Sequence, residues 1–461
     1  MESVPGGKPD FESEGTTHFS EKAEAPQPDP VNDRVGHVVA VWRETTLIWG
    51  GEESGSGSHD SDIQFDPAVV HSHRDGVWTA KTTSGQIPPA TLDGVAEVIG
   101  DSLYLFGGRV DEDSNSNEIY RLEDSNSNEI YRLELNTWVW SKLEPKGTRP
   151  LKSSFMVSWV CGEKMFIFGG ECDNKEAGTF YPAALEVVEG EFDTLCNQLV
   201  FYDCRDNSWN WPTALGTTPS PRNKHAAFHV EGRYSRKVGS LEKCFRSLAF
   251  VFGGQGASGD ELNDLHFLDM VTMKWELVHH HDPVSDMNPE PRAYHSLTRI
   301  SSKAAVLFGG FNTGSFHWWI DGSFRDCWHL NIGNCVAQEG EDEQAEWRRM
   351  YDIWTYAYGH ADQGWRSSHR AVQEPNSRRI WMIGGVSEVG LDDEKVDHIR
   401  ELTFAAPSLK VLALESVAGN YKKLESEIRD LPETFVLRQG IEAKAARKYT
   451  ISHSMAGQYE W

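Results

Sequence analysis

The chain has 461 residues, a formal net charge of −26 at pH 7 and seven cysteines. The negative charge argues against a general nucleic-acid-binding or anionic-membrane surface. No apolar run approaches the roughly 20 residues that a membrane-spanning helix needs, and the first residues lack the apolar core of a secretory signal. The cysteines are odd in number and include no Cys-x-x-Cys pair, which fits a reducing compartment. We therefore expect an intracellular protein, cytoplasmic, nuclear or both, with no nucleic-acid or membrane partner.

Residues 1–30 are rich in Pro, Glu, Ser and Gly and nearly free of apolar residues. Such a composition predicts a disordered arm, since it cannot bury enough apolar surface to order the chain.

A hairpin that ends in two glycines recurs through residues 31–405. In one copy, a strand-like run from His295 to Ile300, a polar turn and the apolar run Ala304–Phe308 lead to Gly309 and Gly310. The six glycine pairs are Gly50/Gly51, Gly107/Gly108, Gly169/Gly170, Gly253/Gly254, Gly309/Gly310 and Gly384/Gly385. An Arg-x-x-His segment precedes four of them, at Arg34/His37, Arg222/His225, Arg292/His295 and Arg366/His369. Tryptophans follow most copies, at Trp78, Trp138/Trp140, Trp209/Trp211, Trp275 and Trp347.

Period, double glycine and tryptophan together resemble kelch repeats, in which each repeat is one four-stranded blade. A single blade cannot bury both faces of its sheet, so the copies must stack around an axis. We predict an all-β fold, a six-bladed kelch β-propeller over residues 31–405. The Arg-x-x-His segments recur at one position of the repeat, so we interpret them as structural hydrogen-bonding elements.

The second repeat contains an exact duplication. Residues 113–123 are repeated without change as residues 124–134. The second copy has the regular spacing to Trp138, so we assign it to the blade and the first copy to an extruded loop.

After the last repeat the apolar spacing becomes helical. Apolar residues fall on one helical face at Leu409, Leu412, Ala413, Val417, Tyr421, Leu424 and Ile428. We predict a short helical tail over residues 406–446, followed by a flexible C-terminus at 447–461. The tail is too short to bury a core of its own, so it should pack on the propeller or on a partner.

Two motifs in this tail resemble known recognition boxes. Ser408, Leu409, Ala413 and Val417 have the spacing of a BC-box, whose helical face inserts into a groove on elongin C. Leu431, Pro432 and Phe435 resemble a cullin-2 box, and the second proline of a cullin-5 box is absent. Propeller and boxes in this order resemble the kelch domain-containing substrate receptors of cullin-2 RING ubiquitin ligases.

This resemblance implies a non-catalytic adaptor that binds elongin C (with elongin B) and cullin-2 and takes substrate C-termini in the propeller's central pocket. The alternative is a kelch scaffold unrelated to ubiquitination, whose tail only packs on the ring. Pull-down of elongins separates the two interpretations.

The resemblance also points to pocket residues. Receptors for glycine ends clamp the terminal carboxylate with two arginines, and those positions are Gln255 and Glu261 here. In the family, tyrosines follow two other double glycines, and those positions are Glu52 and Glu171 here. The aromatic residue of blade five in the family is retained here as Tyr294. We therefore expect these five residues to line a pocket that disfavours a bare Gly-Gly end. The alternative is that Lys152 or Arg109 holds the carboxylate.

The sequence offers little support for metal or enzymatic chemistry. His279, His280 and His281 stand together beside Pro283 but have no further ligand spacing. The ligand set of the copper-radical oxidases, which also use kelch propellers, finds no support. Gly-x-Ser-x-Gly, phosphate-loop and His-Glu-x-x-His motifs are absent. We predict no catalytic residue, metal or cofactor.

Overall fold

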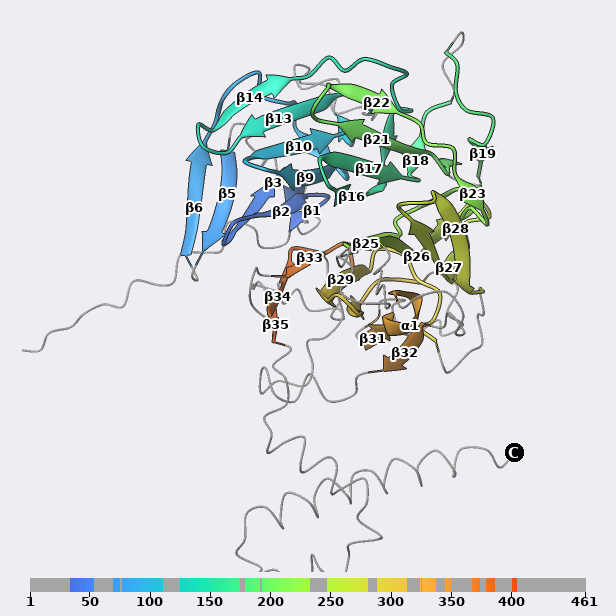
Figure 1. The fold of residues 1–461 in the computed structure, drawn as a ribbon. Coiled ribbons are helices and arrows are strands. Elements are labelled where there is room, and N and C mark those ends of the chain that lie inside the picture. Colours follow the sequence, from blue (N-terminus) through green and yellow to red (C-terminus); the bar gives the residue numbers. More distant parts are fainter. Residues whose placement is uncertain are drawn as a thin grey trace, which may run out of the picture.

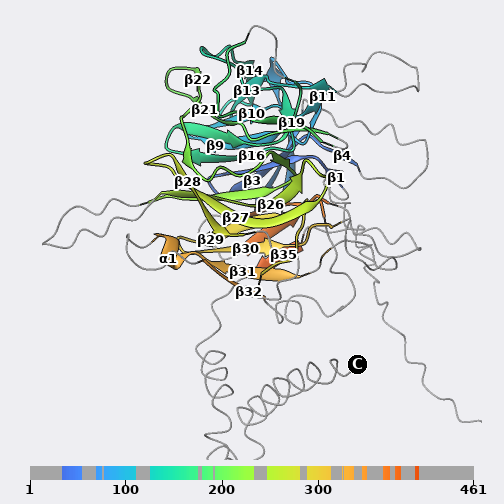
Figure 2. The same ribbon diagram turned by 90° about the vertical axis from the view of Figure 1, so that its right-hand side faces the viewer.

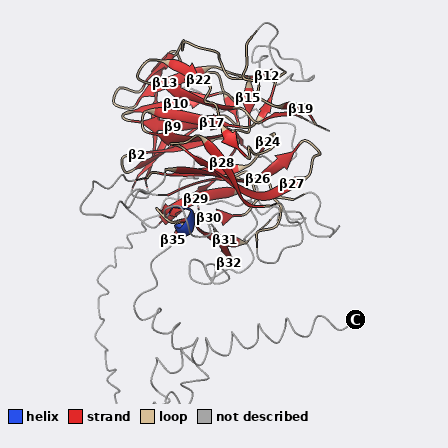
Figure 3. Ribbon diagram, turned by 45° about the vertical axis from the view of Figure 1, so that its right-hand side comes forward, coloured by secondary structure: helices blue, strands red, loops and turns tan. Residues whose placement is uncertain are grey.

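The computed structural model describes residues 34–53, 69–74, 77–110, 125–174, 179–190, 193–232, 247–280, 288–312, 324, 326–336, 345–349, 367–373, 379–385 and 400–403. Within them, six antiparallel sheets stand around a common centre as propeller blades (Figure 1). A view at 90° shows these sheets as consecutive layers (Figure 2). Almost every described element is a strand, and the helix among them is α1 (Gly333–Val336) in blade 5 (Figure 3).

The first strand of each blade is the innermost, and neighbouring first strands contact one another around the ring. These strands are β2 (Val38–Trp42), β9 (Val95–Ile99), β16 (Val157–Cys161), β25 (Ala226–Val230), β29 (Ser296–Ser301) and β33 (Arg370–Gln373). The second strands, which lead into or contain the double glycines, are β3 (Thr45–Trp49), β10 (Ser102–Phe106), β17 (Lys164–Phe168), β26 (Leu248–Gly256), β30 (Ala304–Phe308) and β34 (Arg379–Ile383).

Two further strands complete each blade toward the outside. The third strands are β5 (Val69–Arg74), β13 (Ile130–Glu134), β21 (Leu199–Asp203), β27 (Glu261–Asp269), β31 (Cys327–Asn331) and β35 (Arg400–Thr403). The fourth strands are β6 (Val77–Thr82), β14 (Val139–Lys142), β22 (Ser208–Asn210), β28 (Lys274–His279) and β32 (Glu346–Arg349). Blade 6 has three strands within the described residues.

Short strands extend several blades beyond their main sheets. At the double-glycine end they are β1 (Arg34–Val35), β4 (Glu52–Glu53), β8 (Thr91–Leu92), β11 (Arg109–Val110), β12 (Ser125–Asn126), β15 (Ser153–Ser154), β18 (Glu171–Cys172), β19 (Val187–Glu189), β20 (Thr194–Cys196) and β24 (Arg222–Asn223). On the outside, β7 (Ser84–Gly85) and β23 (Leu215–Gly216) pair in parallel with β14 and β28.

The core lies between blades, because each large cluster of buried apolar side chains joins two consecutive blades. Leu47 of blade 1 shares a cluster with Leu103 of blade 2, and Phe168 of blade 3 shares one with Trp275 of blade 4. Ile48 and Ile383 form the cluster that joins blades 1 and 6. The ring closes there, where Gly385 N donates to Arg34 O at 2.8 Å and the last blade (orange) lies beside the first (Figure 1).

The predicted six-bladed propeller is confirmed. The second copy of the duplicated segment supplies β12 and β13, as its spacing to Trp138 predicted. Residues 113–123, the arm at 1–30 and the tail from residue 406 lie outside the described residues. In the part of the chain that the structure describes, no helix is long and apolar enough to cross a membrane.

Candidate functional site

One residue of each blade lies close to the axis with a left-handed backbone. It is the third residue of the Arg-x-x-His segment or its equivalent in blades 2 and 3. The six are Gly36 (φ 67°), Asp93 (58°), Phe155 (52°), Lys224 (56°), Tyr294 (57°) and Ser368 (57°). A positive φ is uncommon for residues with a side chain and persists only where the surroundings fix it.

Backbone hydrogen bonds run from blade to blade through these residues. The five residues after Gly36 each donate an N–H to the carbonyl oxygen of the preceding one: Asp93 to Gly36 at 2.8 Å, Phe155 to Asp93 at 2.9 Å, Lys224 to Phe155 at 3.1 Å, Tyr294 to Lys224 at 3.0 Å and Ser368 to Tyr294 at 3.1 Å. This bonding fixes the left-handed conformation and holds the side chains around the axis at one end of the ring. We call that end the mouth.

The arginines of the segments serve the fold. Arg222 Nη1 donates to Gly253 O at 3.0 Å and to Asp264 Oδ1 at 2.7 Å, and Arg292 makes the equivalent bonds to Gly309 O and Asp326. Burial raises the pKa of Asp264, but the charge and hydrogen bonds of Arg222 outweigh burial and hold that pKa far below its usual range. Each arginine therefore fixes the double-glycine turn of its own blade.

The histidines also serve the fold. A Cβ added to Gly169 would lie 2.7 Å from Cε1 of His225, and one added to Gly253 would lie 2.9 Å from Cε1 of His295. The preceding blade thus needs glycine where the histidine packs. Burial, with a smaller effect of Arg222, lowers the pKa of His225 to about 3, so the ring is neutral at pH 7. These contacts agree with the structural interpretation of the Arg-x-x-His segments.

Short strands bring the residues after the double glycines to the mouth. Each pairs with the residue just before a left-handed position: Val35 with Glu52, Leu92 with Arg109, Ser154 with Glu171, Asn223 with Gln255 and Ala293 with Phe311.

Two cations and two aromatic rings lie together at the mouth, between the left-handed residues and the short strands that follow the double glycines. Arg109 donates to Asp93 Oδ2 at 2.9 Å, and its guanidinium lies 5.0 Å from the Phe155 ring centroid. Lys224 Nζ lies 5.3 Å from the centroids of both Phe155 and Tyr294, whose rings meet edge to face at 5.9 Å. We call these five residues (Asp93, Arg109, Phe155, Lys224, Tyr294) the mouth cluster.

Glu171 lies beside the mouth cluster. Burial, followed by the charge of Asp193, raises its pKa to about 7, while Arg109 and Lys224 oppose the rise. Within the described residues its carboxyl group makes no hydrogen bond, whereas Lys224 is engaged by Gln255 Oε1 at 3.0 Å and by Asp193 at 3.7 Å. Glu171 is therefore a carboxyl group that titrates near neutral pH and is open to a partner.

The five predicted pocket residues do not share one environment. Tyr294 belongs to the mouth cluster, Glu171 lies next to it, and Gln255 contacts it through Lys224. Glu52 holds the equivalent position in blade 1 and is exposed. Glu261 is in register with Gln255 but only 6% exposed. Arg109, which was the alternative candidate for holding the carboxylate, belongs to the mouth cluster. Substrate binding by any of these residues stays a prediction.

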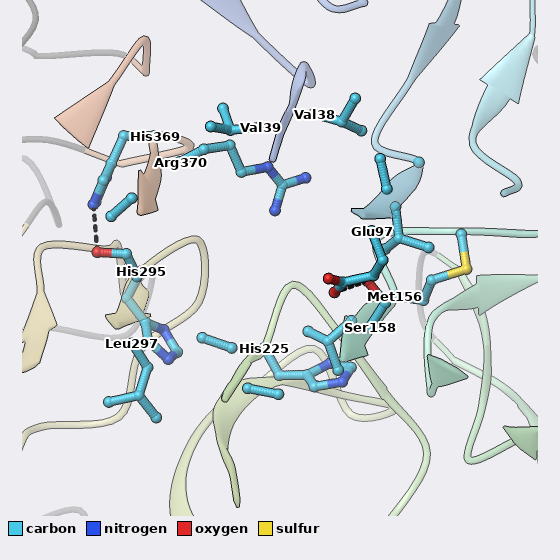
Figure 4. Close-up of a pocket in the computed structure, with 18 residues that line it drawn as sticks. Val38, Val39, Glu97, Met156, Ser158, His225, His295, Leu297, His369 and Arg370 are labelled. Atoms are coloured by element: carbon cyan, nitrogen blue, oxygen red, sulfur yellow. Dashed lines mark hydrogen bonds between the residues drawn. The ribbon is translucent and has the colours of Figure 1, made fainter. Parts of the chain in front are cut away.

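Below the mouth, the six innermost strands line an open cavity of about 190 Å³. Val, Ala, Leu and Met side chains line it together with polar groups, which make up most of its exposed surface, and we call it the central cavity. Figure 4 shows Glu97 of blade 2 and Arg370 of blade 6 pointing into it from different walls. Ser158 Oγ donates to Glu97 Oε1 at 2.8 Å, and Arg370 Nε donates to His37 O at 3.1 Å.

Sequence reasoning missed the residues of the central cavity and part of the mouth cluster. Aligning the repeats on Tyr294 would have found Lys224, Phe155 and Asp93, which hold the same position. Arg370 and Glu97 gave no comparable signal, because a polar residue within a strand is ordinarily taken as facing solvent.

No metal site emerges from the part of the chain described here, where no three His, Cys, Asp or Glu side chains gather suitably. His279 Nε2 is instead within 2.8 Å of Ala345 O, and His281 lies outside the described residues. The tail residues Ser408, Leu409, Ala413, Val417, Leu431, Pro432 and Phe435 also lie outside them.

Comparison with known proteins identifies the repeat. Residues 36–248 match the family model described as the KLHDC2/KLHL20/DRC7 Kelch-repeats domain. The chain is 28% identical to Kelch domain-containing protein 2 of Bos taurus over 61% of its own length and 64% of that protein. It therefore spans less than two thirds of that relative.

Two other relatives show how widely such repeats are used. Kelch domain-containing protein 1 of Mus musculus is 25% identical over 64% of this chain and 68% of that protein. Human Host cell factor 1 is 27% identical over 62% of this chain but only 12% of that protein. The chain thus carries a kelch-repeat interaction domain related to that of Kelch domain-containing protein 2.

Proposed function

We propose, on the premise that this chain carries a kelch-repeat interaction domain related to that of Kelch domain-containing protein 2, that it recognises substrates for a ubiquitin ligase. In this role the tail binds elongin C, together with elongin B, and cullin-2. The propeller mouth binds the C-termini of substrate proteins. The chain performs no covalent chemistry and works in the cytoplasm, the nucleus or both.

The observation that carries the proposal is the order of the tail motifs. Ser408, Leu409, Ala413 and Val417 come directly after the last blade, and Leu431, Pro432 and Phe435 follow after a spacer. Leu and Ala at helical spacing are common in protein cores, so either box alone is a weak signal. Both boxes in this order after a propeller fit an adaptor that links substrate to ligase.

The mouth supports the substrate half of the proposal. Its side chains come from several blades, and their backbones are fixed by the hydrogen bonds that join Asp93, Phe155, Lys224, Tyr294 and Ser368. Cations, carboxyl groups and aromatic rings on a rigid frame suit the recognition of a peptide end.

Capture of elongin C tests the ligase half. We expect the purified full chain to retain the elongin B/C complex and the variant Leu409→Ser with Ala413→Asp to lose it, because a charge facing an apolar groove costs several kcal/mol. Lys422→Ser, in the tail but outside both boxes, is the matched control. Unchanged capture by a folded double variant contradicts the BC-box.

A kelch scaffold unrelated to ubiquitination is the second candidate. The similarity to Host cell factor 1, of which this chain matches only 12%, favours it, since equivalent repeats occur in a much longer protein. The scaffold role predicts that the intact chain captures no elongin, with or without the tail substitutions.

A further inference from the structure

The central cavity contains a guanidinium group, that of Arg370, which the fold uses only in part. Arg370 begins β33 where the other innermost strands begin with Val38, Val95, Val157, Ala226 and Ser296. Its Nε is bound by His37 O at 3.1 Å, while its terminal nitrogens make no hydrogen bond to any described residue. Arg370 is half-buried, and a partly desolvated cation without a hydrogen-bonded anion is costly, so the guanidinium is placed to bind an anionic partner.

Glu97 gives the cavity a second polar wall. It comes from blade 2, and its only hydrogen bond among the described residues is from Ser158 Oγ at 2.8 Å. Figure 4 shows its carboxyl group and the Arg370 guanidinium directed into the same space. An uncharged Glu97 would supply a hydrogen-bond donor to an anion held by Arg370.

The size of the cavity limits the ligand. Its volume of about 190 Å³ exceeds the roughly 150 Å³ of an engineered protein cavity that admits benzene. A mostly polar lining with a few Val, Ala, Leu and Met side chains suits a small polar ligand with a short carbon chain. A planar guanidinium pairs with a carboxylate through two parallel hydrogen bonds.

We propose that the central cavity is a binding site for a small carboxylate, whose anionic group Arg370 binds while Glu97 contacts it from another wall. The carboxylate belongs either to a free small molecule or to the end of a protein chain. Binding of a free carboxylate does not depend on the ligase role, so it can be tested separately from elongin capture.

Burial raises the pKa of Glu97 to about 7, although the hydrogen bond from Ser158 lowers it in part. Of the other titratable groups that line the cavity, burial keeps His225 and His295 neutral by lowering both pKa values to about 3. His369 Nε2 lies 2.8 Å from Ser296 Oγ. The negative charge of Asp93, at the mouth, raises the pKa of Arg370 and so opposes the lowering by burial. Above pH 7 an ionised Glu97 repels a carboxylate, so binding should weaken as pH rises.

Calorimetric titration of the full chain with propionate, and with propionamide as the uncharged analogue, tests the site. We expect propionate to bind the wild type, propionamide not to bind, and Arg370→Gln to weaken propionate at least about tenfold, the loss of a charge-assisted pair. Arg299→Gln is the matched control, because Arg299 also leaves an innermost strand and donates to a backbone carbonyl, His229 O at 3.2 Å, but is exposed. Equal binding of both ligands, or equal affinity in Arg370→Gln, overturns the proposal.

A second variant, Glu97→Gln, tests the site independently in case Arg370→Gln does not fold. The affinity of the wild type for propionate should fall several-fold between pH 6 and pH 8, whereas the Glu97→Gln variant should bind propionate equally at both. A pH dependence in this variant equal to that of the wild type contradicts the role of Glu97. Competition between propionate and a peptide with a free C-terminus, compared with its C-terminal amide, identifies the source. Competition by the free peptide alone assigns the carboxylate to a protein end, and propionate binding without competition assigns it to a free molecule.

Discussion

Phe168, the last residue before the double glycine of blade 3, packs against Trp275 on the outer strand of blade 4 with ring centroids 5.1 Å apart. The same pair recurs as Phe106 with Trp209 at 5.0 Å and Phe252 with Trp347 at 5.0 Å. The aromatic residue, the double glycine and the tryptophan of the repeat thus meet at the boundary between two blades.

This contact should carry much of the stability of the ring. Trp275 is fully buried, so Trp275→Ala should cost about 3–5 kcal/mol in the free energy of unfolding. Val271→Ala, at a residue of the same blade that is 61% exposed, should cost less than about 0.5 kcal/mol. Chemical denaturation followed by tryptophan fluorescence measures both, and a small loss in Trp275→Ala argues against the boundary as the stabilising element.

The fold was predictable because its signals repeat. Gly169 or Trp275 alone would indicate little, but equivalent residues at a fixed period leave few folds that satisfy all copies. Blades 2 and 3 lack the Arg-x-x-His segment, yet Asp93 and Phe155 take the same left-handed conformation as Lys224. Hydrogen bonding to the neighbouring blade imposes that conformation, and a single-sequence pattern does not contain it.

The buried Arg222–Asp264 pair gives a second prediction. Arg222→Met should cost about 3–5 kcal/mol, because it leaves Asp264 buried without its cation. Arg222→Met with Asp264→Leu should recover part of that loss, since the second change removes the unpaired charge. Arg205→Met removes the pair of Arg205 with Asp203, in which the arginine side chain is 63% exposed, and should cost less than about 1 kcal/mol. A double variant as unstable as Arg222→Met contradicts the argument.

Acid should destabilise the ring through its histidines. Burial lowers the pKa of His225 and His295 to about 3, so the unfolded chain takes up protons below about pH 6.5 while the folded chain does not. Each of the two histidines should lower the free energy of unfolding by about 2 kcal/mol at pH 5 relative to pH 7. Blade 3 has Met156 at the equivalent position, so His225→Met with His295→Met should lose less stability over this interval. Equal pH dependence in the double variant and the wild type would falsify the assignment.

The cullin-2 box predicts a separation of partners. Leu431→Ala with Pro432→Ala should weaken capture of cullin-2 and leave capture of elongin B/C unchanged, because we expect the two boxes to contact different proteins. Glu433→Gln, between the box residues, is the control. Preferential capture of cullin-5 by the wild type runs against the cullin-2 assignment.

The candidate site was predictable only in part. The double glycines located Glu52, Glu171 and Gln255 at equivalent positions, since strand pairing after each turn follows from the repeat. Burial of Glu261 and the insertion of Lys224 between Phe155 and Tyr294 depend on side-chain packing across blades. Repeat spacing does not determine such packing.

We expect Glu171 to govern the selectivity of the mouth for peptide ends. Its carboxyl group has no hydrogen-bond partner among the described residues, and the arginine positions of glycine-end receptors hold Gln255 and Glu261 here. We expect peptides with Lys or Arg near the C-terminus to bind at least tenfold more tightly than Gly-Gly-ended peptides. Because the pKa of Glu171 is raised to about 7, the preference should grow between pH 6 and pH 8 as the carboxylate forms.

Substitution of Glu171 measures this selectivity. Glu171→Gln should reduce the preference by about 1–3 kcal/mol, the contribution of one charge pair, and should remove its pH dependence. Glu261→Arg is a poorer test, because Glu261 is 6% exposed and an arginine there would have to be buried. Glu189→Gln, on an exposed residue of the same blade, is the matched control. Submicromolar binding of a Gly-Gly peptide to the wild type by calorimetry would show that Glu171 does not exclude such ends.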